Sequence, residues 1–553
     1  MEVGKTTLGQ LVDIMAERFP GQDALVYPDP GTRYTYRQFR DVCNQAAKGF
    51  MGLGIEKGEN IAIWANNVPE WVITQFSTGK MGAVMVTVNT SYRAFELEYL
   101  LKQSDSTTLI LVPGIRGREY LDTVYKLCPE LNGCAPGRLK SARLPLLKNV
   151  ILIGDETLPG MYNWDEVMAL GESVSDRELA ARQASLDPGD VTNMQYTSGT
   201  TGFPKGVMLT HTNLIGNAVS LAECMAFSEK DRLCIPVPFF HCFGCVLGTL
   251  TCVVSGAAMV PVPSFNPAKV LETVEKEKCT ALHGVPTMFI AELEQMNQRG
   301  YDTSHLRTGI MAGSPCPIEV MKAVVNKMGA REICITYGQT EASPGITMTR
   351  TDDPLELRVT TVGRALPNVE VKIVNPETGE TVASGAQGEL CTRGYHVMKG
   401  YYNMPEATAQ AIDKDNWLHT GDLAVMDENG YCKITGRLKD MIIRGGENIY
   451  PREIEEFLYT HPQLKDVQVV GVPSEKYGEE VVAFVQLKDG QSATEEEIKD
   501  YCGDRIARFK VPAFIIFVAG YPVTASGKIQ KYRLREMAIK QLGREAAAKI
   551  VTA

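Results

Sequence analysis

VTNMQYTSGTTGFPKGVMLTH, from Val191 to His211, is the most informative stretch of this chain. It opens with strand-forming residues, passes through the hydroxyl- and glycine-rich run Thr197 to Gly202, and ends in a second apolar run. We therefore predict a strand, a turn and a second strand. Glycines let backbone N–H groups approach a ligand, hydroxyls add donors, and Lys205 adds a positive charge, so the turn suits a polyphosphate. A solvated linker is the alternative, but linkers rarely place Pro-Lys-Gly between two strand-like runs.

The composition of the 553-residue chain is that of a soluble globular protein, with 44% hydrophobic and 22% charged residues. A net charge of −10 argues against a nucleic-acid-binding surface. No apolar run reaches the roughly 18 residues that a transmembrane segment requires. The 14 cysteines show no pairing framework, so we expect a reducing, cytoplasmic location. Cys242 and Cys245 form a C-x-x-C, but no second pair accompanies them and the seven histidines are dispersed, so we predict no zinc site.

Short apolar runs alternate with helical segments along much of the chain, a pattern typical of βαβ units and parallel sheets. In a first block, we predict helices at 69–81 and 96–102 and strands at 61–64, 84–88, 108–112 and 150–153. In a second block, we predict helices at 267–277 and 317–328 and strands at 253–262, 279–283 and 333–336. The two blocks predict an α/β protein with doubly wound sheets in a large N-terminal domain.

The pattern changes near residue 360, where short alternating strands with Gly and Pro predict a β-rich subdomain. The last part of the chain has its own pattern, with helices predicted at 452–459 and 495–506 and strands at 467–472 and 481–487. It is large enough for a separate, small α+β domain. We therefore expect an N-terminal domain over residues 1–438 and a C-terminal domain over residues 439–553.

The stretch ITYGQTEASPG, from Ile335 to Gly345, begins as a strand and stops at Gly338. The polar residues that follow, Gln339, Thr340 and Glu341, then lie beyond the C-terminal end of the strand, where open α/β sheets bind ligands. A Glu there can coordinate Mg²⁺, a Thr can hydrogen-bond a phosphate, and Tyr337 offers a stacking face. An ordinary surface turn with a polar triplet is the alternative.

Two further stretches carry candidate polar groups. In WLHTGDLAVMDENGY, Asp422 can accept both hydroxyls of a ribose, or it can be a plain strand-edge residue. Downstream, Arg437 has a matching ambiguity between a ribose contact and a structural salt bridge. In PVTASGKIQKYRLRE, Lys528 lies in a Ser-Gly-Lys turn ahead of a basic run, which on its own would more often be a solvated face.

In this order, the four stretches resemble the signature motifs of the adenylate-forming superfamily, which includes acyl-CoA synthetases, luciferases and peptide-synthetase adenylation domains. The resemblance extends over nearly the whole chain. It implies an adenylation core followed by a mobile C-terminal domain that swings about a hinge at Lys439. It also implies that Lys528, Thr340, Glu341 and His241 are catalytic, with Lys528 reaching the α-phosphate and the carboxylate and Glu341 holding Mg²⁺.

The resemblance further implies an ATP and AMP site in which Tyr337 faces the adenine and Asp422 and Arg437 contact the ribose. The complete implied set is Thr197, Ser198, Gly199, Thr200, Thr201, Gly202, Phe203, Pro204, Lys205, Gly313, Ser314, Pro315, Tyr337, Gly338, Gln339, Thr340, Asp422, Arg437 and Lys528. ATP, CoA and Mg²⁺ are the expected substrates and cofactor, without a tightly bound prosthetic group. A homodimer stays an open alternative to a monomer.

The apolar run Pro236 to Gly248 lacks the Asp with which peptide-synthetase domains hold an amino group, so we do not expect an amino acid as substrate. Acetate-type enzymes carry a Trp where this chain has Gly338, which indicates room for a longer or cyclic acid. We predict an acyl pocket lined by His241, Cys242, Phe243, Ala312 and Gly338, with core packing as the alternative. By the resemblance alone, CoA would meet Gly445, Gly446 and Glu447.

The resemblance implies an AMP-forming acyl-CoA synthetase, closest to medium-chain fatty-acid and related carboxylate CoA ligases. The acid would react with ATP to give acyl-AMP and pyrophosphate, and acyl-AMP would react with CoA to give acyl-CoA and AMP. A long-chain ligase and an adenylating enzyme with a non-CoA acceptor remain open. A regulator with a dead site is the non-enzymatic alternative, and the intact motif residues argue against it.

Overall fold

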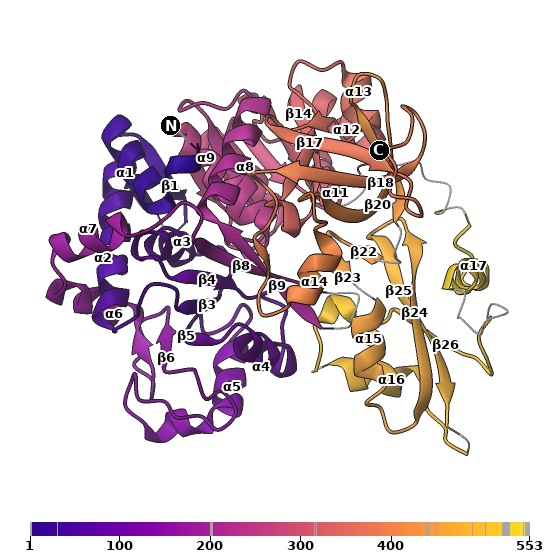
Figure 1. Cartoon of the computed structure of the whole chain (residues 1–553), viewed down its shortest axis with the longest axis horizontal. Helices are drawn as coiled ribbons and strands as arrows, with labels where there is room; N and C mark the ends of the chain where they lie inside the picture. The colour runs from indigo at the N-terminus through magenta and orange to yellow at the C-terminus, as the bar shows by residue number, and fades with distance from the viewer. Residues whose placement is uncertain are drawn as a thin grey trace.

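Figure 1 shows the chain as a computed structural model, in which an N-terminal region (residues 3–437) lies beside a smaller C-terminal region (residues 442–547). The structure describes residues 3–29, 31–198, 203–313, 316, 318–437, 442–449, 451–488, 490–503, 505–522, 531–545 and 547. The strands form four sheets that combine with many helices, as the predicted α/β class requires. Within the described residues, no helix is long and apolar enough to cross a bilayer.

An eight-stranded sheet carries the hairpin predicted from Val191 to His211. Its spatial order is β19 (Gly400–Tyr401), β9 (Pro204–Thr210), β8 (Val191–Ser198), β4 (Val84–Thr87), β3 (Asn60–Trp64), β5 (Ser106–Leu111), β6 (Asn149–Leu152) and β7 (Tyr162–Asn163). The strands from β8 to β7 run parallel, and β9 returns antiparallel to β8. The four strands predicted in the first block are therefore confirmed as β3, β4, β5 and β6.

A nine-stranded sheet contains the second block. Its order is β16 (Arg364–Ala365), β15 (Gly345–Met348), β14 (Glu332–Gly338), β13 (Thr308–Met311), β12 (Ala281–Gly284), β10 (Arg232–Ile235), β11 (Ala258–Pro261), β1 (Asp23–Tyr27) and β2 (Thr32–Thr35). Its central strands, from β14 to β1, are parallel. The C-terminal end of β14 therefore opens toward the ligand-binding edge of the sheet.

The prediction of a strand over residues 253–262 is wrong for residues 253–257. Residues Thr251–Ser255 form α9, which ends at Gly256 in the left-handed conformation, with φ 75°. Only Ala258–Pro261 then form β11. The β-branched side chains of this run pack against α8 (His211–Cys224), so burial outweighs their preference for strands.

Helices pack against both sheets of the N-terminal region (Figure 1). Besides α8 and α9 they are α1 (Leu8–Arg18), α2 (Tyr36–Gly52), α3 (Pro69–Met81), α4 (Ala94–Gln103), α5 (Glu119–Leu127), α6 (Trp164–Leu170), α7 (Asp176–Ala184), α10 (Pro267–Glu277), α11 (Pro286–Gln298), α12 (Ile318–Ala323), α13 (Leu355–Thr360) and α14 (Pro405–Ala411). Helices α3, α4, α10 and α12 confirm the helices predicted in these blocks, although residues 324–328 continue α12 as a π-helix.

The β-rich part predicted after residue 360 is an antiparallel sheet in the order β17 (Val369–Val374), β18 (Gly388–Gly394), β20 (Leu418–Met426) and β21 (Cys432–Arg437). The C-terminal region has a five-stranded sheet of its own. It comprises β22 (Ile442–Arg444), β23 (Glu447–Ile449), β24 (Leu464–Ser474), β25 (Gly478–Leu487) and β26 (Phe514–Phe517), with helices α15 (Pro451–Leu458), α16 (Glu495–Gly503) and α17 (Lys531–Gln541).

Strand β25 shows why the C-terminal region has two small cores. Val481, Ala483 and Val485 join one buried cluster, and Val482 and Phe484 join another. Successive side chains of a strand point to opposite faces, so both faces of this sheet are covered. Helix α17 contributes to the second cluster through Leu534 and Ala538.

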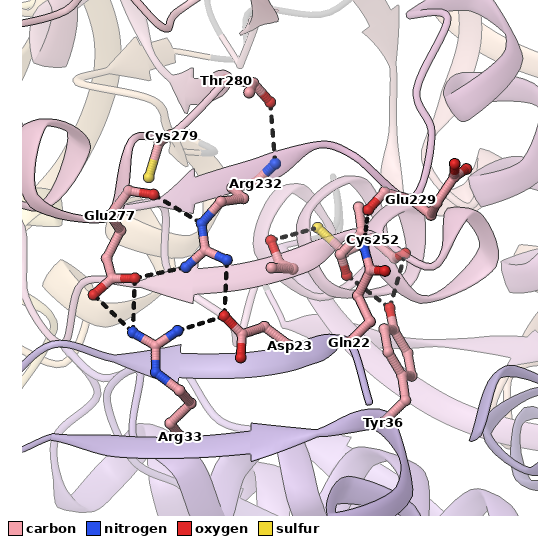
Figure 2. Close-up of polar contacts among 12 residues, drawn as sticks. Gln22, Asp23, Arg33, Tyr36, Glu229, Arg232, Cys252, Glu277, Cys279 and Thr280 are labelled. Carbon is pink, nitrogen blue, oxygen red and sulfur yellow. Dashed lines mark hydrogen bonds and ion pairs between the residues drawn. The ribbon is translucent and has the colours of Figure 1, made fainter. Parts of the chain in front are cut away.

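An ion-pair network joins strands and a helix of the nine-stranded sheet (Figure 2). Arg232, the first residue of β10, lies 2.9 Å from Asp23 and 2.6 Å from Glu277. Arg33 of β2 pairs with the same two carboxylates. Asp23 and Arg232 start their strands, so the network lies at the edge opposite to the one where parallel sheets bind ligands, and it has a structural role.

Candidate active site

The β8–β9 hairpin presents the residues that flank the predicted polyphosphate loop. Thr197 pairs with Lys205 and Ser198 pairs with Pro204 in the antiparallel register, which confirms the two predicted strands. The turn residues themselves, Gly199, Thr200, Thr201 and Gly202, lie outside the described residues.

Helix α4 supports the end of this loop. Phe203, the first described residue after the turn, is exposed, and its ring stacks on Tyr99 of α4 at a centroid distance of 5.1 Å. The hydroxyl of Tyr99 donates a hydrogen bond of 3.0 Å to the carbonyl of Pro204. The start of β9 and the residue before it are therefore held by α4.

Tyr401 connects three of the predicted site residues. Its hydroxyl donates to Oε1 of Glu341 at 2.8 Å, and the hydroxyl of Thr197 donates to the same oxygen at 3.4 Å. The ammonium of Lys205 lies 3.8 Å from the centre of the Tyr401 ring, a cation–π contact. Strand β19 brings Tyr401 here by pairing with β9, a contact across some two hundred residues of sequence. No local motif signals it, and the sequence analysis missed this residue.

The surroundings of Glu341 fit a magnesium ion. Its carboxylate and the hydroxyl of Thr197 are hard oxygen donors at hydrogen-bond distance from each other, which is the ligand type that Mg²⁺ prefers. Glu341 lies in a short 3₁₀ helix, Thr340–Ala342, directly after β14. Its carbonyl accepts a hydrogen bond of 2.9 Å from the backbone of Met398, which holds the turn in place.

Thr340 and Cys242 link the end of β14 to the apolar run Pro236 to Gly248. The Cys242 sulfur lies 3.9 Å from the Thr340 hydroxyl, and both residues are buried. Burial raises the pKa of the Cys242 thiol to about 12, although the contact with Thr340 lowers it. The thiol is therefore protonated at neutral pH and acts as a wall of the site, not as a nucleophile.

Tyr337, near the end of β14, contacts Asp422 of β20. The Tyr337 hydroxyl donates to Oδ2 of Asp422 at 2.7 Å, and Asp422 is buried. Asp422 faces Arg437 across the β20–β21 pair, although the side chain of Arg437 lies outside what the structure describes. The two predicted ribose residues and the predicted adenine residue are thus neighbours.

A buried carboxylate fixes the turn that precedes Asp422. One oxygen of Glu389 accepts the backbone N–H of Gly421 at 2.9 Å, and the other lies 2.9 Å from Nδ1 of His419. The sulfur of Cys391 is 3.4 Å from the same nitrogen. These three side chains could also hold a metal ion, an arrangement that the dispersed histidines did not predict. The hydrogen bonds already explain their placement as support for Asp422.

Three of the predicted acyl residues, His241 to Phe243, lie at the start of a helix. His241 to Phe243 lead into a π-helix, Phe243–Leu250, and the backbone N–H of Phe243 donates to Nδ1 of His241 at 3.1 Å. Burial lowers the pKa of His241 to about 4, so this ring is neutral at physiological pH. Ala312 is buried at the end of β13.

Val285 marks where the predicted acyl and adenine walls meet. A Cβ on Gly313, whose φ is +86°, would lie 3.1 Å from Val285 and 4.0 Å from Phe243. Gly313 is therefore held to glycine by its backbone conformation and by close packing. The neighbouring residues Ser314 and Pro315 lie outside the described residues.

The backbone of the turn after β14 requires a glycine at position 338, which the sequence alone did not indicate. A Cβ at this position would lie 1.8 Å from the carbonyl oxygen of Pro344. The same carbonyl accepts the backbone N–H of Gln339 at 3.0 Å, which closes the turn after β14. A larger residue here would need a different turn, so the absence of a side chain reflects the backbone as well as any room for an acid. Its part in the acyl pocket stays a prediction.

The β22–β23 hairpin of the C-terminal region reaches Val285. Gly445 and Gly446 form its turn, with φ of 59° and 86°, and a Cβ on Gly446 would lie 3.0 Å from Val285. Burial raises the pKa of Glu447 to about 7, although Lys510 and Asn89 lower it. The three predicted CoA residues thus lie beside the predicted acyl wall. The predicted hinge Lys439 and the predicted catalytic Lys528 lie outside the described residues.

Known proteins match this chain over almost its whole length. The family described as AMP-binding enzyme matches residues 12–402, and the AMP-binding enzyme C-terminal domain matches residues 453–528. A putative acyl-CoA synthetase, YngI of Bacillus subtilis, is 62% identical over 539 residues, with 98% of each chain covered. The bovine (Bos taurus) mitochondrial medium-chain acyl-CoA ligase ACSF2 is 43% identical, with 97% of this chain and 88% of that protein covered.

Among solved structures, a double mutant of the o-succinylbenzoate CoA synthetase MenE from Bacillus subtilis, bound to the product analogue OSB-NCoA, is similar with a TM-score of 0.78. It is 26% identical, with 95% of this chain and 98% of that chain covered.

Proposed function

This chain belongs to the AMP-binding enzyme family, and we propose which roles its residues have in the reaction of an AMP-forming acyl-CoA synthetase. The enzyme activates a carboxylic acid with ATP to acyl-AMP, releasing pyrophosphate, and then forms acyl-CoA and AMP. The observation that carries the division of roles is the meeting of Thr197, Lys205 and Glu341 around Tyr401.

Adenylation joins two anions, so its site needs positive charge and hydrogen-bond donors where negative charge collects. Lys205 and the hydroxyls of Thr197 and Thr340 supply these beside the polyphosphate. Glu341 holds Mg²⁺, which neutralises phosphate charge when bound. Asp422 and Arg437 take the ribose, Tyr337 faces the adenine, and Lys528 approaches the α-phosphate and the carboxylate.

The acid has an apolar tail. Gly313 lies close to Val285 and Phe243, and the other predicted acyl residues include Ala312 and a neutral His241. None of these residues offers a fixed charge to a polar tail. ACSF2, whose name gives a medium-chain ligase, is similar over nearly the whole chain, which supports a medium-chain fatty acid. The name of MenE gives o-succinylbenzoate, an aromatic acid, as its substrate. We therefore also include cyclic and aromatic acids among the proposed substrates.

The two half-reactions use two parts of the chain. We assign residues 1–438 to the adenylation core and residues 439–553 to a C-terminal domain that swings about Lys439. Gly445, Gly446 and Glu447 serve thioester formation, because their hairpin lies beside the acyl wall. We place the enzyme in the cytoplasm and in fatty-acid metabolism, and a homodimer is compatible with this proposal.

A substrate panel tests the proposal. Acids from acetate to long-chain fatty acids, together with benzoate and cyclic acids, are supplied with ATP, Mg²⁺ and CoA, while AMP and thioester are measured together. We expect equal amounts of AMP and acyl-CoA, with medium-chain acids saturating at the lowest concentration. AMP formed without thioester would contradict CoA as the acceptor, and a preference for acetate would contradict the open pocket.

A further inference from the structure

A buried ion-pair cluster joins the two regions of the chain, and none of its members belongs to the predicted site. Nζ of Lys510 lies 2.9 Å from Oε1 of Glu96, a residue 414 positions away on α4. Lys510 also pairs with Glu453 of α15, and its ammonium faces the ring of Tyr92 at 5.1 Å. Lys510 is 2% and Glu96 5% exposed. The pair therefore exists only when the C-terminal region is docked in this orientation.

Lys510 is a buried cation that lies among three acids, of which Glu96 is buried. Glu96 and Glu453 contact it directly, and its charge also acts on Glu447 in the β22–β23 hairpin. Glu96 and Glu453 in turn hold the pKa of Lys510 above its usual value, although burial opposes this. Removing one partner of a buried pair leaves an uncompensated charge, which costs far more than losing a surface pair. Undocking the C-terminal region exposes both partners to water instead.

One segment of the N-terminal region receives both the ion pair and the hairpin. Asn89, which lowers the pKa of Glu447, lies between β4 and α4, and Glu96 is in the first turn of α4. Gly446 of the same hairpin packs on Val285 at the acyl wall. The orientation that forms the Lys510–Glu96 pair is thus the one that brings Gly445 to Glu447 to the site.

The same face of helix α4 also contacts residues that flank the predicted polyphosphate loop. Residues 96, 99 and 103 lie three and four positions apart, so their side chains share one side of the helix. Tyr99 contacts Phe203 and Pro204, and Gln103 accepts a hydrogen bond from Tyr196 of β8. The helix that binds Lys510 is therefore fixed against the nucleotide hairpin.

We propose that Lys510 is a positioning residue for thioester formation, whose pair with Glu96 holds the C-terminal region in the orientation that places the 445–447 turn beside the acyl-adenylate. This inference rests on the proposed function, because it separates the two half-reactions. Adenylation is assigned to Lys528 and does not use the 445–447 turn. Loss of the pair therefore slows the second half-reaction and spares the first.

Two variants test this, Lys510→Met, which keeps the apolar stem, and Glu96→Gln, which keeps the shape and the N-terminal capping bond of α4. Adenylation is followed by acid-dependent exchange of pyrophosphate into ATP, and thioester formation by single-turnover transfer from acyl-AMP to CoA. For Lys510→Met we expect thioester formation to fall on the order of 10²-fold, with adenylation unchanged. Glu96→Gln should lower the rate of thioester formation by a smaller factor. The double variant should form the thioester no more slowly than Lys510→Met, because both changes remove the same pair.

Lys80→Met is the matched control. Lys80 is 1% exposed and pairs with Asp13 at 2.6 Å, but both residues are in the N-terminal region. This variant should lower thermal stability and change both half-reactions by the same factor. Equal slowing of both half-reactions in Lys510→Met and Glu96→Gln, or no slowing in either, would overturn the proposal. Failure of the proposed function would look different, since the wild-type enzyme would then show no acid-dependent exchange with any acid of the panel.

Discussion

Replacing Tyr401 with Phe should impair adenylation, although no motif in the sequence marks this residue. The change removes the hydroxyl that donates to Glu341 at 2.8 Å and keeps the ring that faces Lys205. A hydrogen bond to a charged group contributes about 1.5–3 kcal/mol, which corresponds to about 10- to 150-fold in rate if Glu341 must keep this position. Tyr401→Leu also removes the cation–π contact, worth about 0.5–2 kcal/mol more.

The assay is acid-dependent exchange of pyrophosphate into ATP over a range of Mg²⁺ concentrations. We expect Tyr401→Phe to lower the maximal rate and to require more Mg²⁺, because Glu341 is less well held. Tyr431→Phe is the matched control, since its hydroxyl donates to the carboxylate of Asp353 at 2.6 Å and neither residue belongs to the predicted site. Wild-type exchange and Mg²⁺ dependence in Tyr401→Phe would refute the role given to this contact.

Three further predictions concern stability and the turn after β14. Glu292 is fully buried, neither of its oxygens has a hydrogen-bond partner among the described residues, and burial raises its pKa. Its folded form holds a proton that the unfolded form loses above about pH 4.5, so stability falls by about 1.4 kcal/mol per pH unit up to the raised pKa. Glu292→Gln should abolish this slope in urea unfolding at several pH values, and an unchanged slope would contradict it. Arg232→Met breaks two partly buried ion pairs and should destabilise the protein by about 1.5–3 kcal/mol in the same assay without changing substrate preference. A loss below about 1 kcal/mol, as for a surface pair, would contradict the structural role given to the network of Figure 2. Gly338→Ala places a Cβ 1.8 Å from Pro344 and should lower both the melting temperature and adenylation, whereas wild-type values would show that the turn can relax.

Most elements of the fold could be predicted from local sequence because their patterns are consistent with their surroundings. The buried strands β3, β4 and β5 are short apolar runs between helices, and the two faces of β25 follow from its strand period. The strand prediction is wrong at residues 253–255, because they belong to a helix, α9, that packs on α8. Burial of a whole segment removes the alternation that would distinguish the two states.

The candidate site also contains residues that the sequence indicates and residues that it does not. Thr197, Lys205, Glu341 and Asp422 lie in contiguous motifs and could be identified from them. Tyr401 could not, because it reaches the site through the pairing of β19 with β9. The Lys510–Glu96 pair was equally invisible, since its members lie on separate regions and neither stands in a recognised motif. Long-range contacts of this kind are set by tertiary packing.

The most direct test of the division between the two half-reactions is Lys528→Ala measured in both. We expect exchange of pyrophosphate into ATP to fall on the order of 10²–10³-fold, because the role that we propose for this ammonium is to stabilise the charge that develops on the α-phosphate and the carboxylate. Transfer from supplied acyl-AMP to CoA should stay near the wild-type rate. Undiminished adenylation in this variant would contradict the central role given to Lys528.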